Sequence, residues 1–359
     1  MTLRIGLFAE AFGFGPVSKV CTLGKACQQT LDCELVAFGD SITNEYFKRE
    51  GIENVIEVSL ADASDPACVR ALCKNFDLAI IGIQPEWAGE IQLYRPVVYL
   101  DSLGFMWNKK YFSHYPKLRN VEAFLAQDLF GAAQHLADKG IKNIYRVGPL
   151  IALPAETEAE SCSPVIHMGG LANIFNKEDG ILYANFITSL LEGKVSEAIC
   201  SNSIAEAIGN EKHGISFHSL TNQRTRAIFA GAEVLYTSPG LTGLLEAAAV
   251  NANVVPLPPQ NYSQALIVDR IATMQDSDSV WSFLKDHYPI DDQLDEEEGV
   301  ARVQAFNRNY SKNLAFHGAY LRAVKKFGSQ KLPAELAIEN GVSTAVSIVE
   351  SLITKLVKL

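Results

Sequence analysis

The residues best placed for chemistry lie in one block, VLYTSPGLTGLLEAAAVNANVVPLPPQNYSQA, at positions 234–265. A strand there is expected to lead through a Pro-Gly turn into a helix that opens with the N–H groups of Gly240, Leu241 and Thr242. A helix start has unpaired donors and partial positive charge, which suit a diphosphate. Glu246 follows one turn later on the face of Thr242, where it could accept hydrogen bonds from ribose hydroxyls. The block therefore predicts a nucleotide-binding helix start; an ordinary strand–helix–strand crossover is the alternative.

Neighbouring residues extend this predicted pocket. Gly240 has no side chain, which would let the backbone bend and approach a ligand closely. Ser238 comes just before that turn. Gln260 lies in the stretch Pro258-Pro259-Gln260-Asn261, a rigid polar rim that could meet the hydroxyls of a sugar.

A second glycine block, HMGGLANIF, covers positions 167–175 and follows another predicted strand. Gly169, Gly170 and Asn173 could donate hydrogen bonds to a phosphate or a sugar. A tight turn that binds nothing would explain the same residues. His167 is expected to be a hydrogen-bonded structural residue.

Short apolar runs alternate with amphipathic runs along the whole chain, which predicts parallel sheets covered by helices on both faces. Strands are expected at 3–9, 33–38, 54–58, 78–83, 96–100, 144–147, 165–168, 198–200, 232–236 and 253–257. Helices are expected at 16–30, 67–74, 120–139, 184–191, 220–229, 241–250, 264–273 and 334–359. Ligands of such sheets bind beyond the carboxyl ends of the strands.

The length of 359 residues favours two domains. We expect a first Rossmann-like domain at 1–154 and a second at 163–333, doubly wound and facing each other across a cleft. Residues 155–163 are polar and predict a linker, and 276–300 are acidic and predict a peripheral excursion in which 295–298 form a solvated face. The helix at 334–359 is expected to pack back on the first domain.

Composition excludes several classes of function. The net charge of −10 argues against nucleic-acid binding. No apolar run reaches the ~18 residues of a membrane span, and the N-terminus has no signal-peptide pattern. The seven cysteines form no CxxC pair and predict buried, reduced thiols rather than a zinc site. We therefore expect a cytoplasmic protein without a metal or cofactor. Peripheral membrane contact and the oligomeric state stay open.

The block at 234–265 resembles the donor half of GT-B glycosyltransferases, especially the UDP-glycosyltransferases and the enzyme that adds N-acetylglucosamine to the peptidoglycan precursor. The shared order is a glycine turn, a small or hydroxyl residue, a helical Glu, a proline-containing loop and a Gln. It falls on Gly240, Thr242, Glu246, Pro258 and Gln264. The resemblance implies that these residues bind diphosphate, ribose and sugar of a nucleotide sugar, with UDP or dTDP as the carrier.

The first strand–loop–helix, residues 6–26, resembles the acceptor side of that family. Members often have Gly-His before the helix, with the His as general base, whereas this chain has Gly15-Pro16. An inverting transfer needs a base to take the acceptor proton. Glu10 and Asp101 are ranked equally for that role, and either carboxylate could instead cap a turn.

The alternative bases are Glu86, at another predicted strand end, and the two histidines His114 and His167. Asp101 ends an apolar run, where partial burial would raise its pKa. Lys19 is expected at the surface.

The acceptor site is predicted at two places. Phe14, Gly15 and Pro16 lie in the first strand–helix loop. Phe105 and Trp107 belong to an aromatic group, completed by Tyr111, Phe112 and Tyr115, that could form an acceptor platform, a satellite core or a membrane-facing patch.

These patterns predict a metal-independent glycosyltransferase that moves a sugar from a nucleoside diphosphate sugar to an acceptor nucleophile. A sugar-nucleotide epimerase or hydrolase on the same fold is one alternative. A non-catalytic protein that binds nucleotide sugars is the other.

Overall fold

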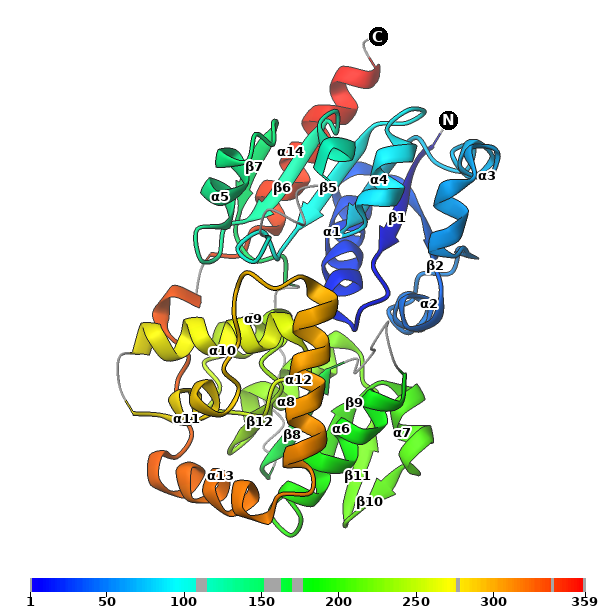
Figure 1. Cartoon of the computed structure of the whole chain (residues 1–359). Helices are drawn as coiled ribbons and strands as arrows, with labels where there is room; N and C mark the ends of the chain where they lie inside the picture. Colours follow the sequence, from blue (N-terminus) through cyan, green and yellow to red (C-terminus); the bar gives the residue numbers. More distant parts are fainter. Residues whose placement is uncertain are drawn as a thin grey trace. The chain divides into compact units, whose positions relative to one another are not determined.

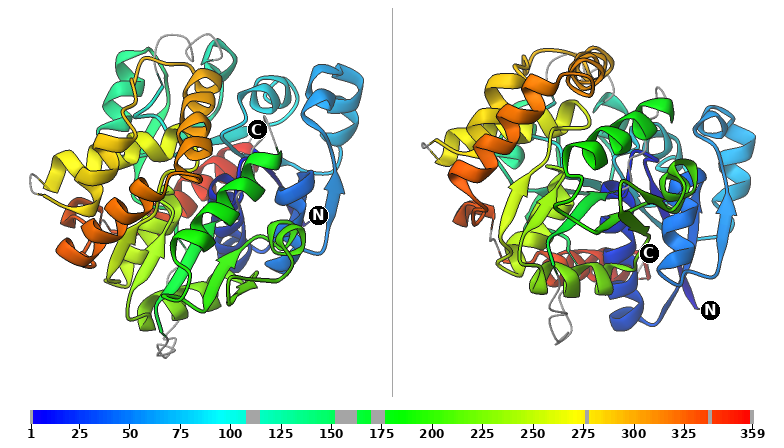
Figure 2. Two further views of the ribbon diagram at one scale, coloured as in Figure 1. Left: turned by 60° about the horizontal axis from the view of Figure 1, so that its bottom comes forward. Right: turned by 90° about the horizontal axis from the view of Figure 1, so that it is seen from below.

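The computed structural model describes residues 2–107, 115–151, 163–169, 177–275, 278–336 and 339–357. The chain divides into two compact units, Met1–Leu153 with Ile338–Leu359, and Pro154–Ala337. Each unit is a parallel or largely parallel sheet with helices on both of its sides (Figures 1 and 2). Each is therefore Rossmann-like.

The first unit contains a seven-stranded sheet in the order β3-β2-β1-β4-β5-β6-β7, and all its strand pairs are parallel. The strands are β1 (Leu3–Ala9), β2 (Cys33–Gly39), β3 (Val55–Glu57), β4 (Leu78–Gly82), β5 (Val97–Asp101), β6 (Ala123–Gln127) and β7 (Ile144–Val147). The helices are α1 (Gly15–Leu31), α2 (Ser41–Arg49), α3 (Pro66–Leu72), α4 (Pro85–Ile91), α5 (Ala132–Asp138) and α14 (Val342–Val357). The strand order reverses between β1 and β4, so ligands are expected beyond their carboxyl ends.

Successive side chains of a strand point to opposite faces of the sheet. In the central strands both sets of side chains are apolar, so both faces of this sheet are apolar. One face packs against α1 and α14, with Leu7 and Leu100 in a continuous aliphatic core. The other face is aromatic: Phe8 stacks on Phe38 with ring centroids 4.5 Å apart and also contacts Trp87 of α4. Both faces are thus covered, which explains why the strands are apolar at nearly every position.

The second unit contains a six-stranded sheet in the order β10-β11-β9-β8-β12-β13, in which only the β10–β11 pair is antiparallel among the described strands. The strands are β8 (Val165–Gly169), β9 (Glu197–Cys200), β10 (Glu211–Lys212), β11 (Ile215–His218), β12 (Leu235–Thr237) and β13 (Val254–Pro256). The helices are α6 (Lys177–Leu190), α7 (Asn202–Ile208), α8 (Asn222–Gly231), α9 (Leu241–Ala249), α10 (Tyr262–Gln275), α11 (Val280–His287), α12 (Glu296–Tyr310) and α13 (Leu314–Phe327). Its strand order reverses between β8 and β12.

Three of the expected elements are wrong. The stretch 120–139 is not one helix: it is the buried strand β6 followed by the short helix α5. A strand buried on both sides is apolar at every position and lacks the alternating pattern, so its sequence resembles the apolar face of a helix. Residues 276–300 are not peripheral, because they contain α11, whose Trp281 is fully buried. The last helix begins at Val342 rather than at 334, after Gly341, whose backbone crosses that of Gly148 without room for a Cβ.

The cysteines of the described residues are free thiols, and five of the six are buried. Burial raises the pKa of the Cys27 thiol to about 12. Cys162 lies outside the described residues. The expected burial of the thiols is confirmed for those five.

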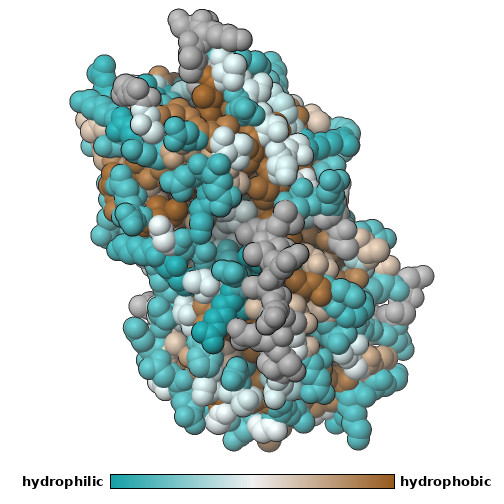
Figure 3. Space-filling view, turned by 180° about the vertical axis from the view of Figure 1, so that it is seen from behind, coloured by the Kyte–Doolittle hydropathy of each residue, from teal (hydrophilic) through white to brown (hydrophobic). Residues whose placement is uncertain are grey.

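Within the described residues, no helix is both long enough and apolar enough to cross a bilayer. On the face that Figure 3 shows, hydrophilic side chains surround apolar ones in both units.

Candidate functional site

The helix start predicted at Leu241 lies at the carboxyl edge of the second sheet, beside the point where the strand order reverses. β12 ends at Thr237, and α9 begins at Leu241 with Gly240 as its N-cap. Leu244 N donates to Gly240 O at 3.0 Å, which closes the first turn. Gly240 has no side chain, so no side chain at the N-cap position accepts from the first N–H groups. The helix start has the features that suit an anion.

Gly240 differs from its expected role in the turn. Its φ is −76° and its ψ is 132°, a conformation that any residue adopts, so the turn does not need glycine. Among the described residues, a Cβ there would meet only Gln264 Nε2, at an ordinary contact distance of 3.5 Å, so none of them excludes a side chain at this position.

His167 packs against the same helix start. Its Nδ1 lies 3.1 Å from Thr237 Oγ1, and its ring meets Phe229 edge-on with centroids 4.9 Å apart. A Cβ at Gly243 would lie 2.8 Å from the His167 ring, so Gly243 makes room for it. The imidazole has the structural contacts that the sequence predicted.

The loop after β13 is held rigidly over the ends of β8 and β12. Gln260 Nε2 donates to Met168 O at 2.7 Å and to Ser238 Oγ at 2.6 Å. The Tyr183 hydroxyl donates to Pro258 O at 2.6 Å. The side chains of Ser238 and Gln260 therefore connect three segments of the unit by hydrogen bonds and help to stabilise its fold.

Gln264 is positioned for a ligand. Its Oε1 accepts from Gln260 N at 2.9 Å, which fixes the amide group in one orientation. Its Nε2 faces Gly240 and has no hydrogen-bond partner among the described residues. The Gln264 amide is thus an available donor beside the α9 N-terminus.

Two residues of α12 support this loop and were missed in the sequence. Gln304 Nε2 donates to Gln260 O at 2.9 Å, and Asn307 Nδ2 donates to Pro259 O at 3.0 Å. Both side chains are buried. The sequence around Gln304 and Asn307 indicates only an amphipathic helix. It does not indicate that these two side chains donate hydrogen bonds to carbonyl groups of residues far away along the chain.

Glu246 is buried rather than open to solvent. Its Oε1 lies 3.9 Å from Arg226 NH1 of α8, and the two side chains are 8% and 5% exposed. Arg226 Nε and NH1 have no hydrogen-bond partner among the described residues. The carboxylate is therefore part of a buried ion pair that the sequence did not indicate, and its contact with a ribose stays a prediction.

The acidic run at the start of α12 is not only a solvated face. Asp295 and Glu298 form a capping box, in which Glu298 N donates to Asp295 Oδ1 at 2.7 Å. Burial raises the pKa of Glu296 from 4.5 to about 7. Folding therefore favours the protonated form of this carboxyl.

Glu296→Gln is expected to raise stability only at higher pH. A folded-state pKa above the unfolded one means that folding favours the protonated acid, so stability is lost as pH rises from about 4.5 to about 7. The Gln variant cannot ionise. It should match the unchanged protein near pH 4.5 and exceed it by about 1–3 kcal/mol at pH 8 in urea unfolding. Equal stabilities at pH 8 would show that ionised Glu296 is well solvated.

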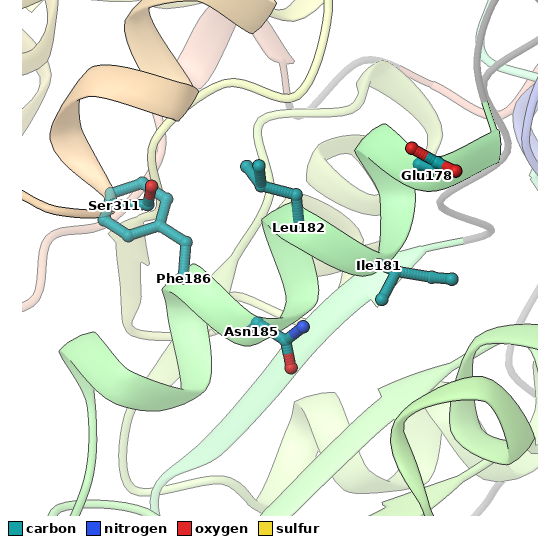
Figure 4. Close-up of a pocket in the computed structure, with 6 residues that line it drawn as sticks. All are labelled: Glu178, Ile181, Leu182, Asn185, Phe186 and Ser311. Carbon is teal, nitrogen blue, oxygen red and sulfur yellow. The ribbon is translucent and has the colours of Figure 1, made fainter.

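A groove of about 500 Å³ runs along α6 (Figure 4). It is lined by Glu178, Ile181, Leu182, Asn185, Phe186 and Ser311. Figure 4 shows Ser311 beside the Phe186 ring, and Asn185 Oδ1 is buried without a hydrogen-bond partner among the described residues. The described residues that were predicted to bind the donor do not line this groove.

In the first unit, the two candidate bases differ in their surroundings. Asp101 is 1% exposed, and both of its oxygens accept hydrogen bonds: Oδ1 from Leu103 N and Oδ2 from Trp107 Nε1, each at 2.7 Å. Glu10 is half-buried at the end of β1, where its N–H donates to Gly82 O. Asp101 therefore holds the following loop, and a role in proton transfer stays a prediction for both carboxylates.

The predicted acceptor residues are more buried than an open platform would be. Phe105 and Trp107 are 7% and 6% exposed, and Phe105 packs edge-on against Phe130. Phe14 is half-buried at the start of α1, with the Arg49 guanidinium 4.4 Å from its ring centroid. Phe105 and Trp107 are therefore core residues. Contact of any of the three with an acceptor stays a prediction.

The start of α1 corrects the expected place of Lys19. Pro16 occupies the first turn after Gly15, as predicted. Lys19 is 2% exposed rather than at the surface, and its Nζ donates to Gly15 O at 3.3 Å.

Some predicted residues lie outside the described ones. They are Gly170, Asn173, His114, Tyr111 and Phe112, together with the side chain of Tyr115. Gly169 is described: it ends β8 with φ +64°, a conformation that favours glycine.

Comparison with solved structures covers almost the whole chain. The glycotransferase of kitacinnamycin matches with a TM-score of 0.52 at 11% identity, over 98% of this chain and 99% of the other. LpCGTa in complex with UDP matches with a TM-score of 0.52 at 12% identity, over 99% of both chains. A ugt transferase from Siraitia grosvenorii in complex with UDP matches with a TM-score of 0.50 at 9% identity, over 98% of this chain and 100% of the other. The chain has a GT-B glycosyltransferase-like fold.

Identity this low establishes the GT-B fold alone. No protein-family model matches the chain, and no curated protein matches it either. The two Rossmann-like units of the GT-B fold confirm the predicted fold class. What the GT-B chain binds has to be argued from its own residues.

Proposed function

We propose that this protein transfers a sugar from a nucleoside diphosphate sugar, with UDP or dTDP as the carrier, to an acceptor nucleophile. The observation that carries the proposal is the start of α9. Its N-cap is a glycine, which has no side chain to accept from the first N–H groups, and Gln264 Nε2 lies beside that glycine. Two of the structures that share the fold are complexes with UDP.

In this proposal the diphosphate lies against the N–H groups at the start of α9. Partial positive charge there stabilises the negative charge that develops as the sugar leaves. Gln264 Nε2 donates to the phosphate or the sugar, and Glu246 accepts from the ribose hydroxyls. Because the backbone N–H groups offset the negative charge of the diphosphate, the proposed reaction proceeds without a bound metal ion.

The transfer itself follows from one displacement. Glu10 takes the proton of the acceptor hydroxyl, and the acceptor oxygen forms a bond to the anomeric carbon. The bond from that carbon to the diphosphate oxygen breaks, and the nucleoside diphosphate leaves with the electron pair. Attack opposite the leaving group inverts the anomeric configuration.

The test is calorimetric titration with UDP, dTDP and their glucose conjugates, followed by mass spectrometry of products with a panel of acceptors. The proposal predicts micromolar binding of a nucleoside diphosphate and a glycosylated acceptor that also forms in the presence of a chelator. Loss or isomerisation of the sugar without an acceptor would instead favour a hydrolase or an epimerase. Binding without turnover of any donor would favour a non-catalytic protein.

A further inference from the structure

A chain of hydrogen bonds runs from the interior of the second unit to Gln264, in the first turn of α10. The Tyr288 hydroxyl donates to Asn307 Oδ1 at 2.8 Å, and Asn307 Nδ2 donates to Pro259 O at 3.0 Å. Gln260 N then donates to Gln264 Oε1 at 2.9 Å. Pro259 O and Gln260 N are the two ends of one peptide group, whose planarity couples their directions. Each group in the chain therefore accepts from the group before it and donates to the next.

The backbone groups fix the direction of this chain. Pro259 O can only accept, so the part of the Asn307 amide that faces it has to be the NH₂ group. Gln260 N can only donate, so the part of the Gln264 amide that faces it has to be the oxygen. The other end of that amide, Nε2, lies 3.5 Å from the position that a Cβ on Gly240 would occupy. The chain therefore ends in a donor beside the start of α9.

The side chains of this chain are buried. Tyr288 and Asn307 are 2% and 0% exposed, and Gln264 is 8% exposed. Hydrogen bonds in such surroundings are stronger than in water, and each one polarises the next. Hydrogen bonds to charged acceptors are about twice as strong as those between neutral groups. The donor at the end of the chain therefore suits a phosphate oxygen.

Gln304, one turn before Asn307 on α12, makes a similar contact outside this chain. Its Nε2 donates to Gln260 O at 2.9 Å, which belongs to the next peptide group. Its Oε1 is buried without a hydrogen-bond partner among the described residues. Gln304 thus supports the same loop from the same helix, but its hydrogen bond is not part of the chain that ends at Gln264.

We propose that Asn307 is a positioning residue of the donor site, which acts through the Pro259–Gln260 peptide group to hold Gln264 Nε2 toward a phosphate oxygen. The presence of a phosphate there rests on the proposed function; the orientation of the Gln264 amide does not. Without the Asn307 donor, the peptide group and the Gln264 amide lose the hydrogen bond that fixes their direction. The ligand then loses a preformed donor, although Gln264 itself is unchanged.

The test compares Asn307→Leu with the matched control Gln304→Met by calorimetric titration with UDP. Asn307→Leu is expected to weaken binding about tenfold, the worth of one hydrogen bond to a charged group, and Gln304→Met less than about threefold. In a Gln264→Met background, Asn307→Leu should have no further effect, because the residue through which it acts is gone. Equal losses in the Asn307 and Gln304 variants, or the same loss with and without Gln264, would overturn the positioning role.

A second variant guards against a folding defect in Asn307→Leu, which leaves the buried Tyr288 hydroxyl without its acceptor. Tyr288→Phe combined with Asn307→Leu removes that hydroxyl and should unfold at a higher urea concentration than Asn307→Leu. Its affinity for UDP should still be about tenfold weaker than that of the unchanged protein. Normal affinity in the double variant would overturn the positioning role.

A measurement without nucleotide separates this inference from the proposed function. Hydrogen exchange at Gln260 N, observed by NMR with isotope-labelled glutamine, reports the bond to Gln264 directly. Exchange should be at least about tenfold faster in Asn307→Leu than in the unchanged protein, and much less changed in Gln304→Met. This pattern in a protein that does not bind UDP would keep the orientation of Gln264 and contradict the donor site. Unchanged exchange in Asn307→Leu would overturn the inference even if UDP binds.

Discussion

Gly240→Asp is expected to stabilise the second unit while it removes binding of UDP. An Asp side chain at an N-cap accepts from the first helical N–H groups and adds about 0.5–1 kcal/mol, because glycine offers no such acceptor. The backbone conformation at Gly240 accepts any residue, and a Cβ there meets, within the part of the chain that the structure describes, only Gln264 Nε2 at 3.5 Å. The same carboxylate would occupy the diphosphate position and repel it, which should weaken binding of UDP at least about 100-fold, or roughly 3 kcal/mol.

Gly240→Asn is the matched control, since it caps the helix without a charge. Its melting temperature should also rise, and its affinity for UDP should fall by less than that of the Asp variant. Calorimetric titration and thermal unfolding of both variants give the comparison. A Gly240→Asp protein that binds UDP normally would show that the diphosphate lies elsewhere.

Glu246→Ala is expected to lower the free energy of unfolding by about 3–5 kcal/mol. Glu246 and Arg226 form a buried pair, and Glu246→Ala leaves the Arg226 charge buried without its carboxylate. Arg226→Met removes the other partner and should also be destabilising. Urea unfolding measures both. A loss below about 1 kcal/mol in either variant would show that the pair is solvated.

The double variant Arg226→Met with Glu246→Leu separates the structural role of the pair from a role in binding. Replacing both charges by apolar groups should recover at least half of the summed loss. If Glu246 also accepts from ribose, affinity for UDP should remain about 1–3 kcal/mol weaker in this restored protein. Normal affinity would leave Glu246 with a structural role only.

The sequence predicted elements best where an apolar run ends at a Pro or Gly. β12, α9 and β13 begin and end within a few residues of their expected positions, because Ser238-Pro239-Gly240 and Pro258-Pro259 mark their limits. β6 was missed because a strand buried on both faces has no alternating pattern.

The contacts of the candidate site were less predictable because they depend on tertiary packing. Gln304 meets the carbonyl of a residue 44 positions away, and Asn307 meets one 48 positions away. The Arg226–Glu246 pair likewise joins two helices, and neither residue type indicates the other. Gly240 is the opposite case: a glycine before a helix predicts a turn that needs glycine, but its φ of −76° is open to any residue.

The most direct test of the account is a crystal structure with UDP bound. The prediction is a diphosphate within hydrogen-bond distance of the backbone nitrogens of Leu241 and Thr242, with Gln264 Nε2 donating to it. A UDP molecule bound elsewhere, for instance in the groove along α6, would contradict the proposed donor site.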